Sequence, residues 1–177
     1  MLKSSMQKKL NIFILVLFFT QSLVAKEPLM ALLMNVQSND VQQFKINNYK
    51  LNCSAYGVLS IDELYRKSGF DSKCKESIKG FYEKRAELKY YTSSKLNVMQ
   101  SYSIELKNDN KCIVYASGGK TLSEFLLENG LAVLKPLFKD EEFKYYFNKS
   151  QQNAKMKRKG IWQDNITKEC ISDIYKK

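Results

Sequence analysis

Apolar and polar positions follow the most regular pattern in the C-terminal half of the chain. The run Cys112-Ile-Val-Tyr-Ala116 contains side chains that favour β-strands, and the glycine pair that follows it is a turn signal. Thr121 and Glu124 then have the spacing of a capping box, and Gly130 fits the position at which such a helix ends. This order predicts a strand, a tight turn and a short helix with both ends marked.

A long amphipathic helix is predicted over residues 141–159. Phe143, Phe147 and Ala154 lie on one stripe, which Trp162 continues as a plug against the core. The other sides of the helix carry five cations that are candidate nucleic-acid contacts: Lys149, Lys155, Lys157, Arg158 and Lys159. Cations in the last turn of a helix are also favoured by the macrodipole, by about 0.3–1 kcal/mol each. Both explanations stay open at this point.

The N-terminal half shows the alternation of strands. Val41–Leu51 alternates around the turn Asn47-Asn48 and predicts a hairpin, and residues 53–61 continue as a third extended segment. Residues 71–88 then have helical spacing of apolar positions. The apolar stretch within residues 26–37 predicts either a leading helical turn or an edge strand.

A fourth strand is predicted over Leu96–Leu106, and the Cys112 strand is the fifth. The predicted fold is therefore α+β and mainly β. It is a five-stranded OB-type barrel with one helix inserted after strand three and two C-terminal helices. Closure of such a barrel removes exposed sheet edges.

The start of the chain has the features of an export signal. Three lysines precede a short apolar run, and Ala25 offers a small residue at the cleavage point. The run is too short to span a bilayer, so we expect no membrane span after cleavage and a periplasmic or extracellular protein. The predicted division is a signal peptide at 1–25, an N-terminal lead-in at 26–37, one OB-fold domain at 38–165 and a tail at 166–177.

The residue types present restrict the chemistry. The chain has four cysteines, and an even number in an exported protein predicts two disulfides: Cys53, Cys74, Cys112 and Cys170 are the partners, in a pairing that the sequence leaves open. The chain has no histidine, which excludes Ser-His and Cys-His catalysis. Scattered cysteines without histidine also make a zinc site a poorer explanation than disulfides.

The chain is basic. Its formal net charge is +11, which falls to +8 when the three lysines of the signal peptide are removed. Such a charge favours polyanions, namely nucleic acid, anionic lipid or a cell-envelope polymer, and it is equally typical of a solubilising surface.

Two C-terminal stretches resemble the staphylococcal nuclease (thermonuclease) family. They are Tyr115-Ala-Ser-Gly-Gly-Lys-Thr-Leu-Ser-Glu-Phe-Leu-Leu-Glu-Asn-Gly-Leu-Ala132 and Lys149-Ser-Gln-Gln-Asn-Ala-Lys-Met-Lys-Arg-Lys-Gly-Ile-Trp162. The resemblance covers about fifty residues and implies the same five-stranded barrel that the strand pattern predicts. It also implies calcium-dependent cleavage of nucleic acid in the family's active members.

The family's catalytic motifs are reduced in this sequence. In active members two Asp bind calcium, a Glu activates water and two Arg neutralise the charge that grows on the phosphoryl group. Asp40 and Asp62 match the two metal-binding Asp and are the candidate metal ligands. Gly57 stands in place of the first Arg and Tyr65 in place of the Glu, while Lys111 is the only cation of the third motif.

Two neighbouring residues could replace the missing groups. Glu63 is a candidate carboxylate and Arg66 a candidate guanidinium in a rearranged site. The pair Asp62-Glu63 is equally typical of a helix start, and Asp40 of a turn.

Three functions follow. The first is an exported barrel protein without hydrolytic activity that binds nucleic acid or an envelope protein. The second is a secreted calcium-dependent nuclease with a rearranged site, for which calcium would be the cofactor. The third is a structural subunit of an envelope complex, with aromatic contacts at Lys89–Tyr91 and Phe143–Phe147.

Overall fold

The computed structural model describes residues 27–69, 72–163, 166 and 169–170. The predicted signal peptide and most of the predicted tail lie outside the described residues. Within the described residues, no helix is long and apolar enough to cross a membrane.

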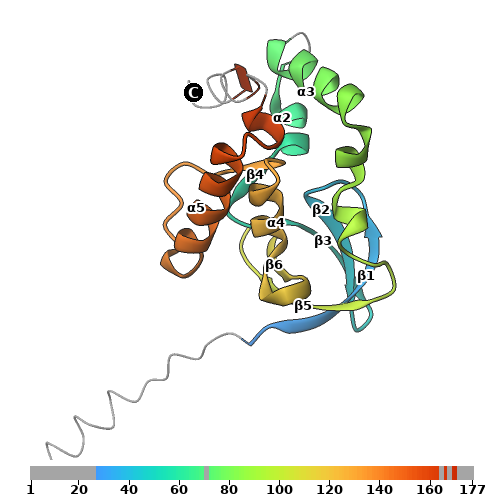
Figure 1. Ribbon diagram of the computed structural model, residues 1–177. Coiled ribbons are helices and arrows are strands. Elements are labelled where there is room, and N and C mark those ends of the chain that lie inside the picture. Colours follow the sequence, from blue (N-terminus) through green and yellow to red (C-terminus); the bar gives the residue numbers. More distant parts are fainter. Residues whose placement is uncertain (1–26, 70–71, 164–165, 167–168, 171–177) are drawn as a thin grey trace, which may run out of the picture.

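Five strands form a closed barrel, as the sequence predicts. Around the barrel the order is β1-β2-β3-β6-β5, and β1 pairs with β5 to close it. Neighbouring strands are antiparallel except β3 and β6, which are parallel. The bounds are β1 Leu29–Val36, β2 Val41–Ile46, β3 Tyr49–Ala55, β5 Ser101–Leu106 and β6 Lys111–Tyr115. The described part of the chain is thus a β-barrel with helices on one side, above and to the left of the barrel in Figure 1.

The first barrel strand lies in the stretch predicted as a lead-in. Residues 29–36 form β1, which resolves the choice between a helical turn and a strand in favour of the strand. Ala31 and Leu33 are buried at alternate positions, and β1 is paired on both sides, so it is no edge strand. The barrel therefore begins before residue 38.

The third predicted strand is wrong in its extent. β3 ends at Ala55, and Gly57 adopts φ +73° and turns the chain out of the barrel. Val58–Ser60 forms a separate strand, β4, which pairs with β7, Ala132–Leu134, outside the barrel. The fourth predicted strand begins late, at Ser101, because Met99 at φ +66° interrupts it.

Four named helices lie outside the barrel in the described part of the chain, one more than predicted. The bounds are α2 Ile61–Lys67, α3 Lys73–Lys84, α4 Leu122–Glu128 and α5 Glu141–Met156. The capping box of α4 is present, with Thr121 accepting from the Glu124 N–H at 3.2 Å. The described residues also form short 3₁₀ helices: Ala86–Tyr90 and Thr92–Ser94 between α3 and β5, Ser117–Gly119 between β6 and α4, and Gly160–Trp162 after α5.

The helix missing from the prediction is α2. Ser60 is its N-cap and accepts a hydrogen bond from the Glu63 N–H at 2.8 Å. Asp62 and Glu63 occupy its first turn, where carboxylates stabilise the N-terminal end of a helix. The explanation of this pair as a helix start is therefore confirmed.

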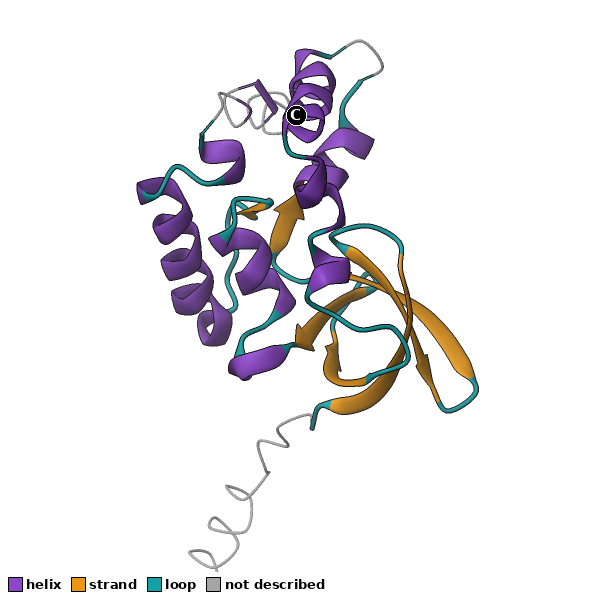
Figure 2. Cartoon of the chain, turned by 45° about the vertical axis from the view of Figure 1, so that its right-hand side comes forward, coloured by secondary structure: helices purple, strands orange, loops and turns teal. Residues whose placement is uncertain are grey.

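One continuous core joins the barrel to the helices. α4 lies between the barrel and α5 in both views, packing on β6 and on α5 (Figure 2). Phe143, Phe147 and Ala154 are buried on the inner stripe of α5, as predicted. Those two phenylalanines are thus core residues and are not available as contacts for a partner.

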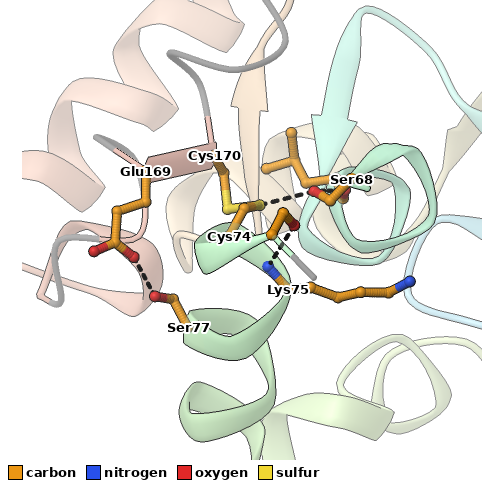
Figure 3. The surroundings of a disulfide bond; sticks show 8 residues. Ser68, Cys74, Lys75, Ser77, Glu169 and Cys170 are labelled. Carbon is orange, nitrogen blue, oxygen red and sulfur yellow. Dashed lines mark hydrogen bonds between the residues drawn. A yellow bond between two sulfur atoms is a disulfide. The ribbon is translucent and has the colours of Figure 1, made fainter. Parts of the chain in front are cut away.

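Two disulfides join segments that are far apart in the sequence. Cys53–Cys112 links β3 to β6, and Cys74–Cys170 links the start of α3 to the C-terminal region (Figure 3). Ser77 also bonds to Glu169 beside the second bridge. All four cysteines are paired, so the predicted number of disulfides is confirmed and the open pairing is settled.

Candidate binding site

The turn between β1 and β2 is hydrogen-bonded to the segment that precedes β5. Asn39 is buried, and its side-chain amide donates to the Leu88 carbonyl at 2.9 Å. Its side-chain oxygen accepts from the Thr92 N–H at 3.0 Å, and its backbone carbonyl accepts from the Thr92 hydroxyl at 2.7 Å. These bonds fix the backbone that carries the neighbouring Asp40.

Asp40 forms an ion pair with Arg66 of α2. One Asp40 oxygen lies 2.8 Å from Arg66 Nη2, and the other accepts from the Ser38 hydroxyl at 2.9 Å. The Asp40 side chain is only 2% exposed, whereas that of Arg66 is 49% exposed. Burial lowers the pKa of Arg66, but the bond to Asp40 and its charge outweigh burial and raise it. The guanidinium therefore neutralises a buried carboxylate.

Asp62 lies in the same cluster but bonds to other donors. Its two oxygens accept from the Asn39 N–H at 3.0 Å and from the Tyr82 hydroxyl at 2.7 Å. Burial raises the pKa of Asp62 despite these bonds. Burial and the Asp62 charge raise the pKa of Tyr82, so this phenol remains a hydrogen-bond donor at neutral pH. We call Asp40, Asp62, Arg66 and Tyr82 the α2 cluster.

Glu63 is nearly buried between two lysines. Lys67 lies 2.6 Å from one of its oxygens and Lys111 3.2 Å from the other. Burial alone would raise the pKa of Glu63, but the two lysines outweigh burial and lower it. A carboxylate with a lowered pKa and two charged partners is a poor proton acceptor.

The candidate metal ligands do not fit calcium in this arrangement. Calcium takes six to eight oxygen ligands, which carboxylates, carbonyls and waters supply. No group of three or more acidic or other metal-binding side chains is present in the part of the chain that the structure describes. Asp40 and Asp62 lie near each other, but their oxygens accept from Arg66, Ser38, Asn39 and Tyr82. The carboxylate oxygens that a calcium ion would need are therefore already bound by groups of the protein.

A second feature beside Glu63 is a basic cleft of about 320 Å³. Three of its lining residues are Lys107, Lys111 and Lys135, and Tyr56 and Phe138 contribute aromatic rings. Burial, followed by repulsion from Lys111, lowers the pKa of Lys135. Sequence reasoning missed Lys135 and Lys107. The latter could have been found as the first of two lysines that bracket the turn 108–110.

The structure places the five residues predicted to contact nucleic acid in different surroundings. Lys149 is exposed on α5, and Lys155 lies 4.6 Å from the centre of the Trp162 ring. Lys157, Arg158 and Lys159 follow the end of α5 and line a pocket of about 550 Å³. Two further residues of that pocket, Arg85 and Asn129, come from the ends of α3 and α4.

A comparison with models of known protein families finds a match. The model of the family described as "Staphylococcal nuclease homologue" matches residues 72–164, which is more than half of the chain. No curated protein matches the sequence. The matched region contains α3, α4 and α5, whereas Asp40, Asp62, Glu63 and Arg66 all precede it.

Proposed function

Because the chain belongs to the staphylococcal nuclease homologue family, we propose that it is an exported nucleic-acid-binding module of that fold that does not hydrolyse its ligand. The observation that carries the proposal is the ion pair between Asp40 and Arg66, with 2.8 Å between the charged groups. A side chain of the protein itself holds the carboxylate that an active relative would offer to a cation.

Hydrolysis of a phosphodiester needs three groups that are not engaged elsewhere. It needs a Lewis acid or cation at the phosphoryl oxygens, a base for water and donors for the developing charge. Here the only guanidinium of the α2 cluster is bound to Asp40, and Glu63 is bound to Lys67 and Lys111. Each substitute that the sequence offers is therefore already paired within the protein.

The basic cleft supports nucleic acid as the ligand. Ligands of this kind are held by cations along the phosphate backbone and by aromatic rings on which bases stack. Lys135 supplies the first feature together with Lys107 and Lys111, which also pair with Glu105 and Glu63, and Tyr56 and Phe138 supply the second. The ring of Tyr56 packs edge-on against Phe138, with 5.4 Å between their centres.

The two disulfides support export. Such bonds persist in oxidising compartments and are rare in the cytosol. We therefore place the mature protein in the periplasm or outside the cell, after removal of the signal peptide at 1–25.

Incubation of the mature protein with single-stranded and duplex DNA tests this function. We expect no cleavage with calcium or with chelator, and binding whose logarithm falls linearly with the logarithm of the salt concentration. Lys135→Gln should make that slope shallower by about 0.7 for a single strand, the value of one phosphate contact. The matched control is Lys50→Gln, which removes an exposed lysine on β3 and should leave the slope unchanged.

Calcium-dependent cleavage that Asp62→Ala abolishes would overturn the proposal in favour of a rearranged nuclease. Binding of DNA that does not respond to salt would contradict the electrostatic part and favour an envelope protein as the partner.

A further inference from the structure

The pocket at the end of α5 is built from the ends of three helices. Arg85, Asn129 and Lys157 are the C-cap residues of α3, α4 and α5, and all three line the pocket. Arg158 and Lys159 complete its set of four cations. We call this site the helix-end pocket.

The backbone of the helix-end pocket is fixed by a contact between two glycines. Gly160 adopts φ +56°, and a Cβ atom placed on it would lie 2.2 Å from the Gly130 carbonyl oxygen. That oxygen accepts a hydrogen bond from the Ile161 N–H at 3.0 Å, and the Lys159 N–H donates to the Ala154 carbonyl at 2.9 Å. The segment that carries the three consecutive cations is thus held directly against the end of α4.

The side chains opposite this segment are also ordered. Arg85 donates through Nη2 to the Gln163 side chain at 2.6 Å, and the Asn129 amide donates to the Tyr91 hydroxyl at 2.7 Å. Preorganised groups lose less conformational entropy when a ligand binds.

The helix-end pocket has more positive charge than the fold requires. Each helix C-terminus is equivalent to about half a negative charge, so three of them offset at most about one and a half of the three charges on Lys157, Arg158 and Lys159. Among the residues described as lining the pocket, none is acidic. The neighbouring Glu128 bonds to Lys120 at 2.7 Å, and that bond, with additional effects of Lys159 and Lys157, lowers its pKa. A net positive potential therefore remains in the pocket.

We infer that the helix-end pocket is a second anion site, which binds phosphate groups of a nucleic-acid strand. Guanidinium groups match the planar, two-oxygen face of a phosphate, and the lysines add point charges. Its volume of about 550 Å³ accommodates more than one phosphate group. The nature of the ligand rests on the proposed function, whereas the location rests on the pocket alone.

The test compares two charge-matched double variants. Lys157→Gln/Arg158→Gln removes two exposed cations of the pocket, and Lys50→Gln/Lys73→Gln removes two exposed lysines, one on β3 and one on α3, that do not line it. Binding of a labelled single-stranded DNA of 20 nucleotides is measured at several salt concentrations in chelator. We expect the pocket variant to have a slope shallower by about 1.4, since each lost contact with a single strand contributes about 0.7. The control variant should keep the wild-type slope.

Two outcomes would overturn the inference. One is a pocket variant with the wild-type slope and affinity, and the other is a wild-type protein that does not bind the strand. Because both variants change exposed residues, equal melting temperatures confirm that both are folded. Cleavage of DNA by the wild-type protein in the presence of calcium would overturn the proposed function. The slopes measured in chelator would still test this inference.

Discussion

The α2 cluster and the helix-end pocket both gather charged side chains, but they treat the charges in opposite ways. In the α2 cluster Asp40 is paired with Arg66, and Asp62 accepts from two donors. In the helix-end pocket the cations Lys157, Arg158 and Lys159 follow one another along the chain, and the lining residues that the structure describes include no acidic one. A cluster whose charges are matched stabilises the fold, whereas unmatched charges of one sign favour a ligand from outside.

This difference assigns different roles to two regions of one fold. The α2 cluster joins the turn 38–40 to α2 and α3, and so connects the barrel to its helices. The helix-end pocket lies within the matched family region, residues 72–164. Substitutions in the first region should therefore change stability most, and substitutions in the second should change binding most.

The largest effect is expected for Arg66→Met. Removal of the guanidinium leaves the carboxylate of Asp40 buried without its counter-ion, and breaking a buried ion pair on one side costs about 3 kcal/mol or more. Urea denaturation at pH 7 measures the loss. The matched control is Lys67→Met on the same helix, whose side chain is 53% exposed and whose pair with Glu63 should contribute at most about 1 kcal/mol.

The double variant Asp40→Asn/Arg66→Met sharpens this test. Asn keeps an oxygen that can accept from Ser38, and it carries no charge, so most of the lost stability should return. If Arg66→Met were as stable as the wild type, the α2 cluster would not be a structural ion pair.

Much of the fold could be predicted because its local signals agree with its tertiary contacts. The structure contains the capping box at Thr121, the apolar stripe of α5 and the hairpin predicted from the alternation of Val41–Leu51. Even the five-strand count was correct, although one of its strands was misplaced. Gly57 at φ +73° divides the predicted third strand, and β1 supplies the fifth strand of the barrel.

The candidate sites were harder to predict because their chemistry depends on contacts that are distant in sequence. Asp40, Asp62, Glu63 and Arg66 were all selected from the sequence, and the structure places them in one region. That Arg66 bonds to Asp40 across 26 positions, and Lys111 to Glu63 across 48, is determined by the packing of α2 on the barrel. Arg85 could not be assigned to the basic C-terminal segment, because only the tertiary fold brings the end of α3 to it.

The next effect, at least about 2 kcal/mol, is expected for Gly160→Ala. Its positive φ costs a residue with a Cβ atom about 1–3 kcal/mol, and the added atom would displace the Gly130 carbonyl. Because the displaced segment carries Lys157–Lys159, affinity for single-stranded DNA should fall together with stability. The control is Gly80→Ala in α3, where no atom lies within 4 Å of the added Cβ and the substitution should stabilise by up to about 1 kcal/mol. Unchanged DNA binding by a destabilised Gly160→Ala protein would show that the glycine contact does not preorganise the pocket.

The smallest effect is expected for Glu63→Gln, about 1 kcal/mol at pH 7, because Gln keeps an oxygen for only part of the interaction with Lys67 and Lys111. Lys67 and Lys111 lower the pKa of Glu63 in the folded protein, so the stabilisation is complete above the unfolded-state value of about 4.3 and is lost as the pH falls through the folded-state value. The difference in unfolding free energy between wild type and Glu63→Gln should therefore shrink between pH 5 and pH 3, values chosen as about one unit on either side of that reference. The difference is needed because Asp62, whose pKa is raised by burial, shifts both proteins in the opposite direction and cancels. Glu83→Gln removes the same charge at an exposed position of α3 and is the matched control. A pH-independent difference for Glu63→Gln would mean that Glu63 does not act as the charged partner of the two lysines.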